Sequence, residues 1–166
     1  MAYQDRFTAT DNLIAHLTPI VTVIPDAATK SNYAGFLSVS AVTVFELAIK
    51  DIFIEFANQK HLVFGGFIEK HFANLNGRIK LDDLKGQHIK SFGTKYLDKF
   101  EIKLRAREEA IFLATRKNLR SDYSNIILCR HKYVHAGYPT LTFEEVLSNY
   151  QTGKDVIYSL DEAMRR

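Results

Sequence analysis

Apolar residues recur at intervals of three and four positions along most of the chain, which is the spacing of one face of an α-helix. The longest such pattern runs over 33–61, where Val44, Leu47 and Ala48 follow this spacing and no proline intervenes. The sequence has no run of strictly alternating apolar and polar residues, the pattern typical of a half-buried strand. The pattern therefore predicts an all-α domain with a long second helix.

The three prolines are predicted to lie where helices begin or end, because proline lacks the backbone N–H that a helix interior needs. A first helix is expected over about 3–17 and should end before Pro19. The segment from Pro19 to Pro25 then leads to the long second helix. Pro139 should prevent the penultimate helix from continuing.

Glycines at positions 77, 86 and 93 interrupt the pattern between 65 and about 120, which predicts short helices joined by turns. Lys and Arg are concentrated in 103–124, just before the penultimate helix. A solvated helix face and an RNA-binding surface both account for such a run. Ser121 or Asp122 is expected to cap the helix that follows.

The best-marked helix boundaries lie near the C-terminus. A penultimate helix is predicted over about 123–136, because Gly137 can adopt the left-handed conformation that ends helices. A final helix should begin after Thr142, with Glu145 completing a capping box. Residues 1–166 show no repeat or linker, so a single domain is expected.

Composition narrows the class of protein only slightly. A formal net charge of +3 does not by itself indicate a nucleic-acid binder, although it is compatible with a local basic patch. The single cysteine, Cys129, excludes an internal disulfide and a multi-cysteine zinc site, and a buried structural thiol is expected. No apolar run approaches the ~18 residues of a membrane span, and no secretion signal is visible. We therefore expect a soluble, cytoplasmic protein with no membrane partner.

The segment RHKYVHAG places Arg130, His131 and His135 in the last turns of the penultimate helix. Arg130 continues an apolar row with Tyr123 and Ile127 at helical spacing. An arginine in such a row needs an ion partner or an open cleft, because burial of an isolated charge costs several kcal/mol.

Three interpretations of this segment are open. In the first, Arg130 forms a buried ion pair, for which Glu46 on the long second helix is a candidate partner, and the histidines make local hydrogen bonds. In the second, His131 and His135 bind a metal ion, but no acidic residue lies between them and no third ligand is evident, so neither a metal nor a cofactor is predicted. In the third, arginine binds phosphate oxygens and histidine transfers protons at a phosphoryl-transfer site.

Arginine, four residues and then histidine, near the end of a late helix in an all-α domain, resembles the signature of the HEPN family (higher eukaryotes and prokaryotes nucleotide-binding domain). The family places four to six residues between the two, with a polar residue directly after the arginine. Arg130, His131 and His135 match this pattern, and Glu46 is similar to an acidic residue that many members carry on the second helix. The resemblance implies a HEPN-like helical bundle with the motif on its penultimate helix.

The resemblance also implies a metal-independent endoribonuclease, a toxin or anti-phage effector, that acts as a homodimer with two copies of the motif in one cleft. His135 would act as general acid or base, Arg130 would stabilise charge on the phosphate, and His131 would orient or assist. In the subgroup that pairs with a nucleotidyltransferase antitoxin, a tyrosine lies two residues after the histidine. Gly137 occupies that position here and the tyrosine is Tyr138, which argues against that particular partner.

RNA is the predicted substrate, and an antitoxin or other regulatory protein is a candidate partner. The residues predicted to bind the RNA backbone are Lys132, Arg116, Lys117 and Arg120. In the predicted dimer, the apolar row through Tyr123 and Ile127 is covered by the second copy. The alternative is a non-catalytic HEPN-like module that binds nucleotides or partner proteins.

Overall fold

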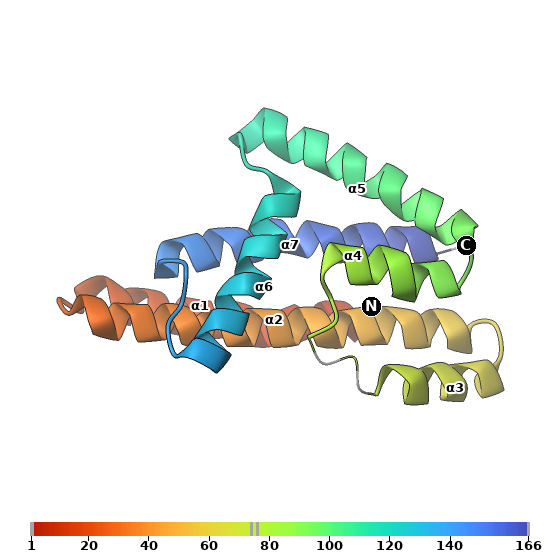
Figure 1. Cartoon of the computed structure of the whole chain (residues 1–166), viewed down its shortest axis with the longest axis horizontal. Helices are drawn as coiled ribbons and strands as arrows, with labels where there is room; N and C mark the ends of the chain where they lie inside the picture. The colour runs from red at the N-terminus through yellow and green to blue at the C-terminus, as the bar shows by residue number, and fades with distance from the viewer. Residues whose placement is uncertain (1, 74, 76, 166) are drawn as a thin grey trace.

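The computed structural model of this chain describes residues 2–73, 75 and 77–165, nearly all of which lie in helices joined by short loops (Figure 1). None of these residues lies in a strand. The prediction of an all-α fold is therefore confirmed.

In chain order the elements are α1 (Ala2–Val23), α2 (Ala27–Asn58), α3 (Leu62–Phe72), α4 (Leu81–Asp83), the π-helical segment η1 (Leu84–Ile89), α5 (Thr94–Thr115), α6 (Leu119–Ala136) and α7 (Phe143–Met164). The predicted long second helix is α2, with 32 residues. It begins before residue 33 because the Asp26 carboxylate accepts a hydrogen bond from the Thr29 backbone N–H at 2.7 Å, which caps its first turn.

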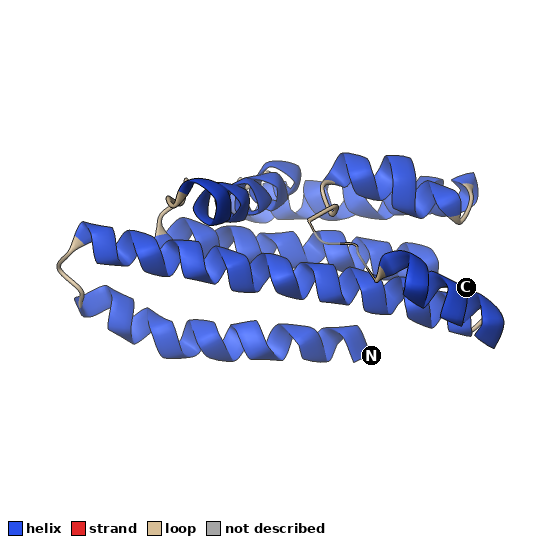
Figure 2. Ribbon diagram, turned by 60° about the horizontal axis from the view of Figure 1, so that its bottom comes forward, coloured by secondary structure: helices blue, strands red, loops and turns tan. Residues whose placement is uncertain are grey.

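The helix α2 contacts α1, α3, α6 and α7, and α7 also contacts α5 and α6. Figure 2 shows α1 packed along α2, and Figure 1 shows α6 crossing α2 and α7 at a steep angle. A short segment containing α4 and η1 follows the loop after α3 and lies in front of α7 in Figure 1. The helix that carries the RHKYVHAG motif therefore crosses the two central helices of the bundle.

A stack of aromatic rings fixes α6 against α2 and α7. The ring of Phe45 lies between Tyr123 and Tyr150, with centroid distances of 5.6 Å to each. All three side chains are fully buried. Tyr123 also donates a hydrogen bond from its hydroxyl to the Ile79 carbonyl at 2.7 Å. That bond joins α6 to the segment just before α4, and these are the two elements that border the candidate site.

The prediction that the first helix ends before Pro19 is wrong, because α1 continues through this proline to Val23. Proline inside a helix removes one backbone hydrogen bond and crowds the carbonyl four residues earlier, at a cost of about 3 kcal/mol that tertiary packing must offset. Leu17 and Val21, on either side of it, are both buried in the core. Their packing keeps the helix continuous, whereas Pro25 and Pro139 lie between helices as predicted.

The middle of the chain is less broken than predicted, because α5 is a single helix of 22 residues. Gly86 lies inside the π-helical segment η1 and does not end it, whereas Gly93 has a φ of 117° and directly precedes α5. Within α5, Phe100 and Leu104 are buried one turn apart. A glycine therefore marks a break here only where the backbone uses a conformation that other residues avoid.

The penultimate helix begins at Leu119, four residues before the predicted start, and its cap is Asn118 rather than Ser121 or Asp122. The Asn118 side chain accepts from the backbone N–H of Ser121 at 2.9 Å. The predicted end is confirmed, since Gly137 terminates α6 with a φ of 79°. The predicted capping box of α7 is also present.

Candidate active site

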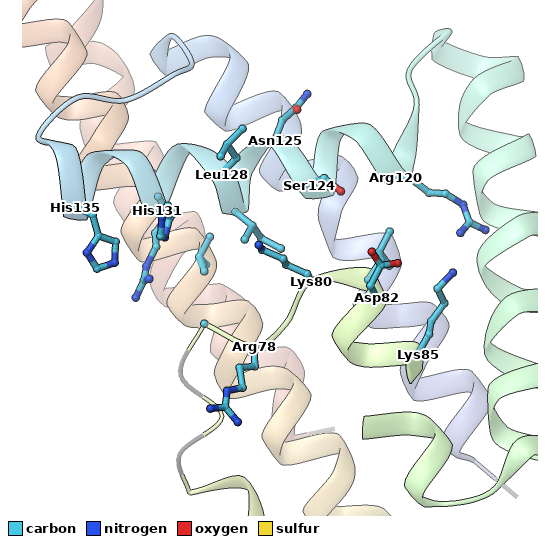
Figure 3. A pocket seen from close by; sticks show the side chains of 15 residues that line it. Arg78, Lys80, Asp82, Lys85, Arg120, Ser124, Asn125, Leu128, His131 and His135 are labelled. Carbon is cyan, nitrogen blue, oxygen red and sulfur yellow. The ribbon is translucent and has the colours of Figure 1, made fainter. Parts of the chain in front are cut away.

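The two histidines of the motif lie side by side on the exposed surface of α6 (Figure 3). Their ring centroids are 4.6 Å apart, and the planes are inclined at 50°. This follows from their separation of four residues, which places side chains on one row of a helix. Both imidazoles are therefore accessible to a substrate.

The surroundings of His131 lower the pKa of its imidazole and so favour the neutral form. Partial desolvation lowers the pKa of this imidazole, and the positive charges of His135, Lys80 and Lys132 lower it further. A neutral imidazole has a free lone pair and can accept a proton at neutral pH. His131 is therefore suited to act as a general base.

Arg130 lines the same pocket as the two histidines and is half-buried, and its Nε atom is buried without a hydrogen-bond partner among the described residues. One terminal nitrogen of the guanidinium lies 3.9 Å from the point that a Cβ atom on Gly77 would occupy. A buried donor without a partner costs about 1–3 kcal/mol, so an acceptor supplied by a ligand would stabilise this side chain. The arginine is therefore placed to bind an anion.

The ion pair between Arg130 and Glu46, one of the interpretations left open by the sequence, is not formed. Instead, the Glu46 carboxylate accepts a hydrogen bond from the backbone N–H of Gly77 at 2.7 Å. Glu46 and Arg130 thus both lie at the loop around Gly77. The acid positions the loop, and the arginine keeps its charge available.

A pocket of about 690 Å³ lies between α6 and the segment 77–85, with the motif residues at one end (Figure 3). Basic residues predominate in its lining, and Asp82 is the one acidic residue among the described residues that line it. The basic side chains are Arg78, Lys80, Lys85, Arg120 and Arg130, together with His131 and His135. Such a lining attracts a polyanion and repels cations.

Of the residues predicted to bind RNA, only Arg120 lines this pocket. Lys117 instead donates to the Ser148 hydroxyl at 2.7 Å. Arg116 ends α5 and lies over the ring of Phe112. Lys132 is on α6 outside the pocket lining. The structure thus brings together the motif and Arg120, and leaves the other three around the outside.

The basic residues of the segment 77–85 are not among those predicted from the sequence. Ile79 is fully buried between Arg78 and Lys80, which are both exposed. The sequence does contain a pattern here, because an apolar residue lies between two cations next to a glycine. Three residues are too few, however, to distinguish a binding segment from an ordinary loop. The contact that places this segment, between Ile79 and Tyr123, joins residues 44 positions apart.

The predicted dimer contact through Tyr123 and Ile127 is wrong, because both side chains are buried within the chain itself. The apolar surface that α6 and its C-terminal end leave exposed is instead formed by Leu128, Val134 and Tyr138, which are 48%, 50% and 53% exposed. Cys129 is buried, as predicted.

The model of the family described as RiboL-PSP-HEPN matches residues 3–166. The chain belongs to this HEPN family. No curated protein and no solved structure matches it. Membership agrees with the all-α bundle and indicates a nucleotide-binding or ribonuclease-type module.

Two further observations bear on this HEPN chain. In the described part of the chain, no helix is both long and apolar enough to cross a bilayer. The same residues contain no group of three or more His, Cys, Asp or Glu side chains suited to hold a metal ion. His131 and His135 therefore lack a third protein ligand of these types within that part of the structure.

Proposed function

We propose that this HEPN domain is a metal-independent endoribonuclease that acts as a toxin or anti-phage effector. The observation that carries the proposal is the position of His131 and His135, exposed on one row of α6 at the end of a basic pocket that also contains Arg130. Two proton-transfer groups and a cation with an unused donor are the parts that phosphodiester cleavage needs.

The reaction uses the 2′-hydroxyl of RNA as the nucleophile. A histidine removes the proton of this hydroxyl, the oxygen attacks the adjacent phosphorus, and the bond from phosphorus to the 5′-oxygen breaks. A second histidine donates a proton to the leaving oxygen. Arg130 stabilises the negative charge that grows on the phosphate oxygens. The products are a 2′,3′-cyclic phosphate and a 5′-hydroxyl, and DNA is not a substrate because it lacks the nucleophile.

A homodimer would place the general base and the general acid on opposite sides of the phosphate. The base and the acid must lie on opposite sides of the phosphorus, whereas His131 and His135 project from the same side of α6 with rings 4.6 Å apart (Figure 3). A second copy across a two-fold axis supplies histidines on the other side. The exposed apolar residues Leu128, Val134 and Tyr138 lie on and just after the motif helix and would be covered by such a partner.

The first test is cleavage of a defined RNA by the purified full chain in the presence of EDTA, with the ends of the products mapped. His135→Ala should lower the rate by roughly 100-fold to 10,000-fold, as expected for loss of a proton-transfer group. His16→Ala is the matched control, because this histidine is exposed on α1, away from the pocket. Cleavage that EDTA abolishes, or an equal rate in both variants, would contradict the mechanism.

The second test concerns assembly and biological effect. Light scattering should give twice the 19.0 kDa chain mass, and cleavage by a protein that remains monomeric would exclude the shared site. Expression of the wild-type chain should arrest bacterial growth, and expression of His135→Ala should not. If the wild-type chain arrests growth, its host needs an antitoxin or other regulatory protein that inhibits it.

The second candidate function is that of a non-catalytic nucleotide-binding module. The observation that supports it is the size of the pocket. A volume of about 690 Å³ is in the range of small-molecule sites. A chain of this kind would bind nucleotides without cleaving RNA, and wild type and His135→Ala would be tolerated equally by growing cells.

A further inference from the structure

The pocket extends well beyond the motif, and the character of its lining changes along its length. Arg120 lies in the first turn of α6 and His135 in the last, and a helix of this length spans about 22 Å between them. In Figure 3 the histidines lie at one end, Lys80 follows beneath α6, and Asp82 lies next to Lys85 and Arg120 at the other end. The motif residues occupy only the end of the pocket where the histidines lie.

The cations at the far end are already neutralised. Glu101 on α5 bonds to Lys85 at 2.8 Å and to Arg120 at 3.3 Å. Glu108 bonds to Arg120 at 2.9 Å. A phosphate there would have to compete with these carboxylates for the same cations. The far end of the pocket is therefore poorly suited to a phosphate.

The cation in the middle of the pocket is available. Within the described residues, Lys80 forms no ion pair, and its side chain extends beneath α6 toward His131 (Figure 3). It is one of the charges that lower the pKa of His131, so its field reaches the motif. A phosphate adjoining the cleaved one would find an unpaired positive charge here.

Between Lys80 and the α6 helix, and on to Asp82, the lining suits a base better than a phosphate. Leu81, Ile127 and Leu128 all line the pocket; Leu81 and Ile127 are buried in the core, so Leu128, which is 48% exposed, supplies the accessible apolar surface. Asp82 has an exposed carboxylate that forms no ion pair with any described residue. A carboxylate accepts hydrogen bonds and repels phosphate oxygens. An apolar wall with one acceptor matches the flat face and the amino edge of a nucleobase.

We propose that this part of the pocket binds the unpaired base of one RNA nucleotide, with its phosphate near Lys80 and an amino group of the base donating to Asp82. The inference rests on the proposed function, because the nucleotide adjoins the phosphate that His135 acts on. The substrate class is single-stranded RNA, in which a base is free to leave its stack. The preferred base is one with an exocyclic amino group, which uracil lacks.

Binding of single nucleotides tests the assignment without any cleavage. Cytidine and uridine 3′-monophosphate are a matched pair of pyrimidines that differ in the amino and carbonyl groups of the base edge. Calorimetry with the wild-type full chain should show cytidine monophosphate bound roughly 3-fold to 10-fold more tightly, the value of one hydrogen bond. Asp82→Asn should abolish this preference, and the control Glu109→Gln, an exposed acid on α5, should retain it. Equal affinities in wild type, or a preference that survives Asp82→Asn, would overturn the assignment of the base.

The phosphate contact is tested separately. Lys80→Ala should weaken both nucleotides by the same factor, since a phosphate contact does not distinguish bases. Lys95→Ala, an exposed lysine at the start of α5, is the control and should change neither affinity. A change in the ratio of the two affinities in Lys80→Ala would show that Lys80 contacts the base, which contradicts the proposal.

Mapping of RNA cleavage separates this proposal from the function on which it rests. Asp82→Asn should remove the preference of cleavage for positions beside amino-bearing bases, and the control Glu109→Gln should keep the wild-type cleavage pattern. An unchanged cleavage pattern in Asp82→Asn would mean that the pocket takes free nucleotides rather than RNA, and would overturn the proposal. If no RNA is cleaved but the nucleotide preference and its loss in Asp82→Asn are as expected, the endoribonuclease mechanism fails and the nucleotide subsite stands.

Discussion

Two basic stretches of the chain lie near the candidate site, and their cations have different partners. In 103–120, Arg107 bonds to Asp155 and Glu162 on α7, and Arg120 bonds to Glu101 and Glu108 on α5. In 77–85, Arg78 and Lys80 have no ion pair within the described residues. The first stretch carries six cations, of which Lys103, Arg107 and Arg120 form ion pairs, and its other cations lie outside the pocket lining. In the second stretch Lys85 is paired with Glu101, but the unpaired Arg78 and Lys80 line the pocket beside the motif.

A high density of basic residues along a sequence therefore does not by itself identify the surface that binds a ligand. What matters is whether acids on neighbouring helices reach the cations, and that depends on packing between residues far apart in the chain. In 103–120 the cations stabilise contacts of α5 with α6 and α7. In 77–85 the burial of Ile79 leaves its two basic neighbours exposed beside the motif.

The largest effect on stability is expected for Arg107→Ala. This arginine holds two carboxylates, and its side chain is 29% exposed, so its loss leaves Asp155 and Glu162 without their shared cation. We expect the free energy of unfolding to fall by about 1–2 kcal/mol in urea denaturation, with RNA cleavage by the folded protein unchanged. Arg105→Ala, an exposed neighbour on α5, should change stability by less than about 0.5 kcal/mol. Lost RNA cleavage with retained stability would show that Arg107 contacts RNA.

A smaller effect is expected on the pH dependence of cleavage in Lys80→Ala. The positive charge of Lys80 contributes to the lowered pKa of His131, so its removal should raise that pKa. If His131 is the base, it must be deprotonated, and the acidic limb of the kcat/KM profile should move to higher pH. The rate near pH 6 should then fall about 2-fold more than the rate near pH 8. A profile that only scales, without a shift of the limb, would exclude His131 as the base.

The smallest effect is expected for Glu101→Gln at the far end of the pocket. Partial burial alone raises the pKa of the Glu101 carboxyl, but hydrogen bonds from Lys85 and Arg120 outweigh it, and the pKa lies below its ordinary value. A lowered pKa stabilises the fold above the pKa of the unfolded chain, and this contribution is lost as the pH falls through the folded pKa. We expect wild type to be more stable by about 0.5 kcal/mol at pH 7, and the two proteins to converge as the pH falls through the lowered pKa of Glu101. A difference that persists at low pH would mean that the carboxyl acts by packing rather than by charge.

The sequence predicts those parts of the fold that depend on local chemistry. The end of α6 at Gly137 and the capping box of Thr142 and Glu145 involve residues within a few positions of one another, and both predictions are confirmed. The end of the first helix at Pro19 is wrong because the buried residues Leu17 and Val21 extend it, and their burial is a tertiary property. Local signals fail where packing outweighs them.

The candidate site also has one part that the sequence predicts and another part that it does not. Arg130, His131 and His135 lie on one helix, so their spacing alone brings them together at the mouth of one pocket. The opposite wall comes from 77–85, which is placed by the hydrogen bond from Tyr123 to Ile79 and by the bond from the Gly77 backbone to Glu46. No local pattern encodes contacts over such separations. Arg78, Lys80 and Asp82 could therefore be found only in the folded chain.

The most direct test of the account is the cleavage rate of single-stranded RNA, with EDTA present, as a function of salt concentration in two double variants. Arg78→Ala with Lys80→Ala should lower kcat/KM by about 10-fold at low salt and flatten the dependence on salt, because phosphate contacts are lost. Arg116→Ala with Lys117→Ala removes the same charge from the other basic stretch and should follow the wild-type curve closely. The reverse result, with the second variant impaired and the first unaffected, would contradict the assignment of the RNA site to α6 and the segment 77–85.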